Sequence, residues 1–237
     1  PEGGIVAVRT GDGRIAGLAA EDGSRKWLFI RQLPGLSLQG TEGLAARDGV
    51  IYAGFPGGKL VALAAATGAQ VWEATVSLPR GATELERVAD VSGRPALDDK
   101  RVCAVSYQGR VACFERARGN QIWARDASSA AGLSMDDRHV YVTDDKDAVT
   151  AYDKDSGRAV WRQDKLANRR LTAPLAMGGH VIVADYEGYV HVLSREDGSF
   201  VARGATDGGS ARAMPIDIGP GFAVQTAKGG VTAFKLN

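Results

Sequence analysis

The chain has 237 residues, of which 44% are hydrophobic, and its formal net charge is +1 at pH 7. The hydrophobic content suffices for a core, whereas the near-neutral charge excludes the basic stripe that nucleic-acid binding requires. No apolar run approaches the ~20 residues that cross a bilayer as a helix. The 31 glycines and the shortage of helix-length amphipathic windows predict an all-β protein.

A repeat with six units organises the sequence. Its units align on one turn position, occupied by Gly13, Gly58, Gly109, Asp147, Gly188 and Gly229. These positions are 45, 51, 38, 41 and 41 residues apart. A period near forty with several short strands per unit is typical of β-propeller blades.

All four tryptophans of the chain occupy one column of the repeat, fourteen residues after the turn position. They are Trp27, Trp72, Trp123 and Trp161, and the next unit has Ala202 there. Each blade is a small antiparallel sheet whose faces its neighbours must cover, so this column predicts residues that dock one blade on the next. We therefore expect residues 1–237 to form a single β-propeller domain of about five four-stranded antiparallel blades plus a partial blade.

The alternation of apolar residues between turn signals predicts the strands in chain order. They are 5–9, 14–18 and a strand from 26; 43–46, 50–54, 59–64 and 70–74; 95–97, 102–106, 110–115 and 121–125; 132–135, 139–143, 148–153 and 159–163; 172–176, 180–184, 189–194 and 200–203; 213–216, 222–225 and 231–235. The first predicted blade lacks an inner strand and the last lacks a fourth strand. No signal peptide begins at Pro1. We expect the chain to be part of a longer precursor that has further N-terminal blades.

Two connections, 29–42 and 77–93, are longer than the repeat requires. Alternating strand directions place both on the face that carries the glycine turns, at successive blade junctions, so we expect them to lie side by side. Long ordered loops in compact domains are commonly functional. The first contains Leu33, Leu36 and Leu38. Either these leucines form an exposed apolar patch or they pack back onto the blades, and the sequence leaves both alternatives open.

Cys103 and Cys113 flank a predicted turn at 107–109. If this is a three-residue loop with its glycine in the left-handed region, Ser106 pairs with Arg110. The two cysteines then face each other at a non-hydrogen-bonded position, where side chains approach most closely. This register predicts a disulfide and hence an oxidising compartment. A two-residue turn would instead place the cysteines on opposite faces, as two buried thiols.

No residues predict a catalytic, metal or cofactor site. His139, His180 and His191 have no neighbours at the spacing of metal ligands. Carboxylates such as Asp155 recur at equivalent turn positions, where aspartate caps tight turns. We find neither a nucleophile–base motif nor a loop that would hold a phosphate.

The repeat unit, V-Y-V-x-x-x-x-G-x-V-x-A-x-D-x-x-x-G-x-x-x-W, resembles that of the pyrroloquinoline-quinone propellers. Three longer segments resemble, more specifically, the BamB family of outer-membrane lipoproteins of the β-barrel assembly machinery. These are LPGLSLQG at 33–40, GATELERVADV at 81–91 and ADYEGYVHVLSREDGSFVA at 184–202. The resemblance covers essentially the whole chain, which corresponds to the C-terminal two-thirds of the family's eight-bladed propeller.

The resemblance implies a non-enzymatic scaffold that binds the POTRA domains of BamA through loops on one propeller face. It also implies a location on the periplasmic side of the outer membrane, with a lipid anchor outside this chain, and unfolded outer-membrane proteins as further ligands. The partner-binding residues that the resemblance implies are Leu36, Ser37 and Leu38 and the acidic stretch of Asp90, Val91 and Ser92. Because the two connections should lie side by side, we further expect the apolar pair Leu36 and Leu38 to have a polar rim of Gln39, Glu84, Glu86, Arg87 and Asp90.

Two positions depart from the family pattern. Gln39 stands where members often have Arg, and Ser92 stands where they often have a second Asp. Both departures predict a weaker electrostatic link between the two loops. We expect Asp90 to be an exposed charge at the rim of the site, where solvent screens it.

Two alternative functions share the repeat. A quinoprotein dehydrogenase that uses pyrroloquinoline quinone, or a fragment of one, would add a cofactor clamp, often of adjacent cysteines, and Ca²⁺ ligands. This sequence has no Cys-Cys pair and no evident convergent acidic cluster. The second alternative is a ligand-sensing propeller domain of a receptor.

Overall fold

The computed structural model describes residues 2–38 and 43–236. Every regular element in these residues is a β-strand. The described residues contain no helix that could traverse a lipid bilayer. Contacts divide the chain into two compact units, Pro1–Ser128 and Ser129–Asn237. The organisation as one domain stays a prediction.

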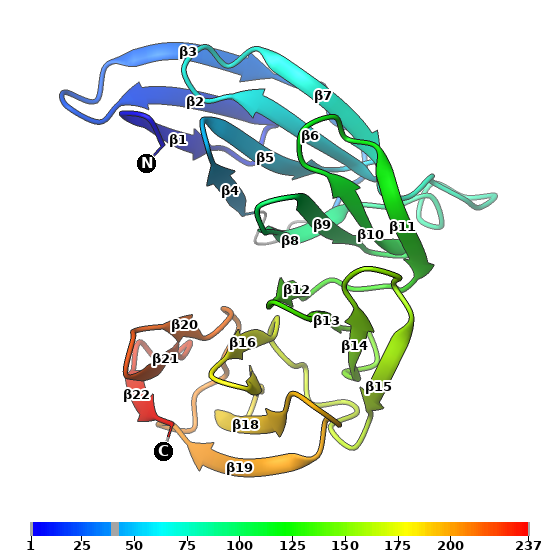
Figure 1. Ribbon diagram of the computed structural model, residues 1–237, viewed down its shortest axis with the longest axis vertical. Coiled ribbons are helices and arrows are strands. Elements are labelled where there is room, and N and C mark those ends of the chain that lie inside the picture. Colours follow the sequence, from blue (N-terminus) through cyan, green and yellow to red (C-terminus); the bar gives the residue numbers. More distant parts are fainter. Residues whose placement is uncertain (1, 39–42, 237) are drawn as a thin grey trace. The chain divides into compact units, whose positions relative to one another are not determined.

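The first unit contains three antiparallel sheets, each formed by strands that follow one another in the chain (Figure 1). The strands are β1 (Ile5–Arg9), β2 (Arg14–Ala19) and β3 (Arg25–Ile30); β4 (Leu44–Arg47), β5 (Val50–Phe55), β6 (Lys59–Ala64) and β7 (Gln70–Thr75); and β8 (Val91–Leu97), β9 (Arg101–Ser106), β10 (Arg110–Glu115) and β11 (Gln121–Asp126).

The second unit continues the same pattern with three further sheets. Its strands are β12 (Gly132–Met135), β13 (His139–Thr143), β14 (Val149–Asp153) and β15 (Ala159–Gln163); β16 (Leu175–Met177), β17 (His180–Ala184), β18 (Tyr189–Ser194) and β19 (Phe200–Ala205); and β20 (Ile216–Asp217), β21 (Gly221–Gln225) and β22 (Val231–Lys235). A succession of small antiparallel sheets, each formed by three or four strands consecutive in the chain, is the arrangement of propeller blades. The predicted β-propeller fold is therefore confirmed.

The hydrophobic core lies in layers between successive sheets. In the first unit, Ile15 and Trp27 of the first sheet pack against Ile51 of the second sheet. The next layer joins Trp72 of the second sheet to Phe114 of the third. Equivalent layers occur in the second unit, one between the sheets of β12–β15 and β16–β19 and one between the sheets of β16–β19 and β20–β22. Each sheet therefore depends on its neighbour to remove its apolar face from water.

Three tryptophans make the same contact with the next sheet of their unit. The indole N–H of Trp27 donates to the Ala65 carbonyl at 2.8 Å. The corresponding bonds join Trp72 to Arg116 at 3.0 Å and Trp161 to Arg195 at 2.8 Å. The rings cover the turn glycines Gly68, Gly119 and Gly198, where an added Cβ would lie 2.5–2.7 Å from indole carbons. These glycines also have φ of +71 to +72°. Backbone conformation and the close approach of the ring thus both require glycine.

Side-chain sizes across β-strand pairs complement the tryptophan column. A small residue faces each tryptophan, and a larger residue faces the alanine that replaces tryptophan in the fifth sheet. The pairs are Gly17 with Trp27, Ala62 with Trp72, Cys113 with Trp123, Ala151 with Trp161, and Val192 with Ala202. Direct cross-strand neighbours share one face, so a bulky indole needs a small partner.

The register of the third sheet settles the two alternatives for the cysteines. Cys103 pairs directly with Cys113 in the β9–β10 ladder, and the two fully buried residues form a disulfide, as the three-residue loop predicted. The left-handed residue of the turn is Gln108, with φ of 47°, and the expectation that its glycine takes this role was wrong. Gly109 serves close approach instead, because a Cβ there would lie 2.3 Å from Ser77 Oγ.

Most predicted strands lie where the structure has them, among them the inner strand β12, but the inner strands β8, β16 and β20 differ. β8 begins at Val91, four residues before the predicted start, and contains a register shift between Ser92 and Ala96. The polar and glycine residues at 92–94 suggested a loop, whereas in the structure they belong to the strand and lie at its register shift. The second long connection therefore ends at residue 90. β16 and β20 are shorter than predicted and begin three residues later.

Reduction of the disulfide should lower the free energy of unfolding by ~2–3 kcal/mol, because a loop of about ten residues loses its constraint in the unfolded chain. Urea denaturation with and without reductant measures this difference. The double variant Cys103→Ala/Cys113→Ala is the control and should not respond to reductant. Two free thiols in the denatured, unreduced protein would contradict the disulfide.

Substitution of the turn glycines should separate backbone strain from the tryptophan contact. Gly23 and Gly68 have φ of +72 and +71°, but only Gly68 lies under a tryptophan, whereas no atom lies within 4 Å of a Cβ at Gly23. Gly23→Ala should cost ~1–2 kcal/mol of stability through strain alone. Gly68→Ala should cost ~1–3 kcal/mol more, because Trp27 must move. Equal urea-denaturation losses for the two variants would show that the ring contact contributes nothing.

Candidate partner-binding site

The described part of the first long connection, residues 31–38 and 43, meets the second, residues 76–90, beside the second and third sheets. The Leu38 amide donates to Asp90 Oδ2 at 2.6 Å, and the Gly43 amide donates to the Gly93 carbonyl at 3.3 Å. The connection 76–90 projects from the first unit beyond the ends of β7 and β8 (Figure 1). The expectation that the two connections lie side by side is confirmed.

Asp90 joins these connections to the sheets beneath them. Its Oδ2 accepts the Leu38 amide, while its Oδ1 accepts the Gly57 amide of the β5–β6 turn at 3.2 Å. Its backbone carbonyl accepts the Tyr107 amide of the β9–β10 turn at 2.9 Å. The residue is only 2% exposed. The expectation of an exposed rim charge was therefore wrong, because Asp90 immediately precedes β8 and lies under the first connection.

A pocket of about 240 Å³ lies between the two connections. Its lining residues are Pro34, Gly35, Leu36, Gly57, Pro79, Glu84, Arg87 and Asp90. Leu36 is 44% exposed, while Ser37 and Leu38 are half-buried. Leu33 packs against the first core layer. The leucines thus divide between the two alternatives, with Leu33 directed inward and Leu36 at the surface.

Hydrogen bonds within the second connection fix its shape. The Glu86 carboxylate accepts the amides of Thr83 and Ala82 at 3.1 and 2.8 Å, and the Thr83 hydroxyl accepts the Glu86 amide at 3.2 Å. Those backbone bonds, led by the one from Thr83, lower the pKa of Glu86 below its usual value. Arg87 Nε donates to the Gly81 carbonyl at 3.0 Å. Glu86 and Arg87 therefore order the loop.

This ordered loop presents an apolar side chain that the sequence reasoning missed. Leu85 is 67% exposed and lies between the two carboxylates Glu84 and Glu86. The signal was available, since Thr83-x-x-Glu86 is the pattern of a reciprocal cap that would fix the turn around Leu85. A large apolar residue held at the surface by such bonds is a candidate contact for a partner.

The remaining implied residues occupy different environments. Val91 lies in β8, is 1% exposed and packs in the second core layer, so it has no surface for a partner. Ser92 is half-buried in the same strand. Gln39 lies outside the described residues. The surface part of the implied set is therefore Leu36, Glu84, Glu86 and Arg87, together with the half-buried Ser37 and Leu38.

Asp185 is the centre of a buried charge cluster in the second unit. Its carboxylate is fully buried and binds Arg169 Nε at 2.6 Å and His191 Nε2 at 2.9 Å. Burial alone would raise the pKa of Asp185, but bonds from His191, the Tyr189 amide and Arg169 lower it overall. Burial lowers the pKa of His191, against the effect of its bond to Asp185. The cluster ties connection 164–174 to the β17–β18 turn.

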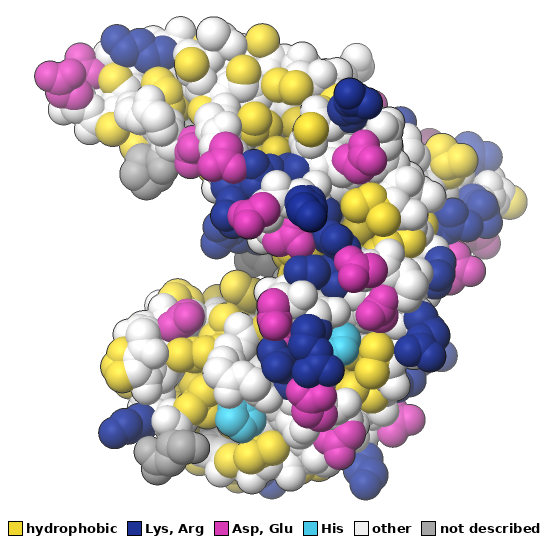
Figure 2. Space-filling model, viewed as in Figure 1, with side chains coloured by type: hydrophobic (Ala, Val, Ile, Leu, Met, Phe, Trp, Pro, Cys, Tyr) yellow, Lys and Arg dark blue, Asp and Glu magenta, His cyan; other side chains and the backbone are white. Residues whose placement is uncertain are grey.

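The described residues contain no group of three or more His, Cys, Asp or Glu side chains that could hold a metal ion. On the face shown in Figure 2, Lys and Arg side chains intermingle with Asp and Glu side chains. The pocket between the two connections combines the apolar residues Pro34, Leu36 and Pro79 with the charged residues Glu84, Arg87 and Asp90.

Comparisons with known proteins identify the family of the chain. A family model described as "Outer membrane protein assembly factor BamB" matches residues 1–163 and 145–237. The protein of that name from Nitrosomonas eutropha is 50% identical over 236 residues, which are 99% of this chain and 58% of the relative. The chain thus spans less than two thirds of the length of that relative.

Two solved structures are similar to this chain to different degrees. The crystal structure of BamB from Moraxella catarrhalis has a TM-score of 0.93 and 30% identity, and the match covers 100% of this chain and 71% of that chain. Quinohemoprotein alcohol dehydrogenase from Comamonas testosteroni has a TM-score of 0.65 at 16% identity, covering 98% of this chain and 44% of that chain, and shares the fold alone. On the family model and the 50% identity, the chain belongs to the BamB family of outer membrane protein assembly factors.

Proposed function

We propose that this chain is a non-enzymatic scaffold of the outer-membrane β-barrel assembly complex, and that it binds the POTRA domains of BamA. The observation that carries the proposal is the exposed Leu36 beside a pocket formed by two connections that Asp90 ties together. A partner would cover the apolar side chain and meet Glu84 and Arg87 around it. An apolar anchor within a polar rim is the usual anatomy of a protein interface.

The order of the site before binding supports this role. Asp90 holds the first connection through the Leu38 amide, and Glu86 closes the turn of the second connection upon itself. Loops that are already ordered lose little conformational entropy when a partner binds, so more of the contact energy appears as affinity. Leu85, exposed within the second connection, extends the apolar contact surface.

Family membership supports the place of action. The relatives carry the name of outer membrane protein assembly factors. A location on the periplasmic side of the outer membrane, with a lipid anchor in the full-length protein, is compatible with the Cys103–Cys113 disulfide, since that compartment is oxidising. Unfolded outer-membrane proteins are further proposed ligands. No observation in the described residues specifically favours a quinone-dependent dehydrogenase or a receptor sensor.

Leu36→Asp should abolish co-purification with the BamA POTRA array while leaving the melting temperature unchanged. A charge at the centre of the interface would be desolvated on binding, which should reduce affinity at least about tenfold. Leu28 is 40% exposed on β3 and does not line the pocket of Leu36, so Leu28→Asp is the matched control and should bind normally. Normal binding by Leu36→Asp, or early melting of that variant, would refute the interface.

Asp90→Ala should reduce both stability and POTRA affinity. The amides of Leu38 and Gly57 lose their acceptor, which should lower the free energy of unfolding by ~1–3 kcal/mol and release the first connection. Asp90→Asn keeps one acceptor oxygen and should lose less. Glu84→Gln, an exposed change at the rim, should leave stability unaltered. Unchanged stability of Asp90→Ala in urea denaturation would exclude the role of Asp90 as a tie.

A further inference from the structure

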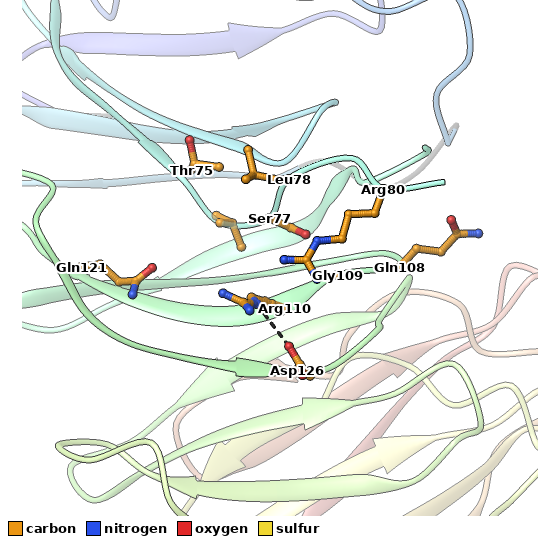
Figure 3. A pocket seen from close by; sticks show the side chains of 10 residues that line it. Thr75, Ser77, Leu78, Arg80, Gln108, Gly109, Arg110, Gln121 and Asp126 are labelled. Atoms are coloured by element: carbon orange, nitrogen blue, oxygen red, sulfur yellow. Dashed lines mark hydrogen bonds and ion pairs between the residues drawn. The ribbon is translucent and has the colours of Figure 1, made fainter. Parts of the chain in front are cut away.

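A second hollow lies on the other side of connection 76–90 and has a volume of about 520 Å³ (Figure 3). Its lining residues are Thr75, Val76, Ser77, Leu78, Arg80, Gln108, Gly109, Arg110, Gln121 and Asp126. Gln121 and Asp126 are the first and last residues of β11, so the hollow runs the length of that outer strand. Six residues of strand extend roughly 17 Å, which suits an extended chain.

The floor of the hollow is built by small and buried groups. Ser77 is 7% exposed and Ser106 is fully buried. A Cβ at Gly109 would lie 2.1 Å from Ser106 Oγ and 2.3 Å from Ser77 Oγ, so any side chain at this position would disrupt the floor. The depth of the hollow is therefore a feature of the fold.

The hollow has one more positive charge than negative. Figure 3 shows the Arg80 side chain extending from the connection toward Gly109 and Arg110. Arg110 Nε pairs with Asp126 at 3.1 Å, and the side chain of Asp126 is 90% exposed. Within the described residues, Arg80 makes no hydrogen bond or ion pair. Two guanidinium groups thus face one solvated carboxylate.

We propose that this hollow binds an extended acidic segment of a partner protein, with one carboxylate held between Arg80 and Arg110. Guanidinium groups bind carboxylates through paired hydrogen bonds. The incoming carboxylate competes with Asp126 for Arg110. Gln121 supplies hydrogen-bonding groups for a peptide backbone, and Leu78, which is 61% exposed, contacts an apolar side chain of the segment. This site is separate from the Leu36 pocket and does not rest on the proposed function.

Fluorescence anisotropy with two capped, labelled hexapeptides tests the proposal on this chain. One peptide alternates Glu and Val, because side chains alternate along an extended strand, and the other alternates Gln and Val. The acidic peptide should bind at 150 mM salt and the neutral peptide should not. Arg80→Gln should weaken binding about fivefold, the upper range for a solvated ion pair. Asp126→Asn should tighten binding, since it frees Arg110 from its internal partner.

Arg118→Gln is the matched control, because it removes the same charge from an exposed position of the first unit outside this hollow. It should leave the affinity unchanged. Equal losses for Arg80→Gln and Arg118→Gln would show a general charge effect and overturn the proposal. Three further results would overturn the proposal: no binding of the acidic peptide, no gain in affinity for Asp126→Asn, or binding of phosphatidylglycerol vesicles that depends on Arg80 when peptide binding does not.

Discussion

The contact of an indole ring with a turn glycine of the next sheet is the interaction on which the fold depends. The ring of Trp27 lies between Gly17 of its own sheet and Gly68 of the next, and its N–H bonds the Ala65 carbonyl. A small β-sheet has no core of its own, so each sheet is stable only against a neighbour. The indole fixes that neighbour through packing and one directed hydrogen bond. Repetition of this contact builds a scaffold from sheets that would not fold alone.

This rigid scaffold lets the connections differ from sheet to sheet. Connection 76–90 carries its own hydrogen bonds, from Glu86 and Arg87, and connection 31–43 is held by Asp90. Through its carboxylate and its backbone carbonyl, the buried residue Asp90 thereby couples the two connections to two hairpin turns. The same means recurs in the second unit, where Asp185 binds Arg169 of a connection and the amides of its own turn. In both cases a buried aspartate orders a surface connection that has no large apolar core of its own.

Much of the fold follows from local signals in the sequence. Strands such as 139–143 and 180–184 were predicted to the residue, because apolar side chains alternate between well-defined turns. The same pairing logic gave two registers for the cysteines, one for each length of the turn, and the structure has the one with three turn residues. The start of β8 could not be predicted, since Ser92 and Gly93 are typical of loops and only pairing with β9 makes them a strand.

The candidate site was less accessible to sequence reasoning. Its location followed from connection length and strand direction, but Leu33 and Leu36 have the same chemistry and only their packing distinguishes them. Asp90 was misjudged for a similar reason. A carboxylate in a loop is usually exposed to solvent. Asp90 is buried because it accepts the amides of Leu38 and Gly57, which are distant in sequence and could not be identified as its partners without the structure.

The complementary sizes of side chains that face each other between the outer strand and its neighbour also limit which substitutions the sequence can accept. In the fifth sheet, Val192 faces Ala202, where the first four sheets pair a small residue with tryptophan. Replacing Ala202 by tryptophan alone would crowd Val192, and shrinking Val192 alone would leave a void, so either single step lowers stability. The two positions should therefore covary among related sequences, with intermediates that are rare. In each blade, the residue at the tryptophan position and the residue that faces it should therefore change together.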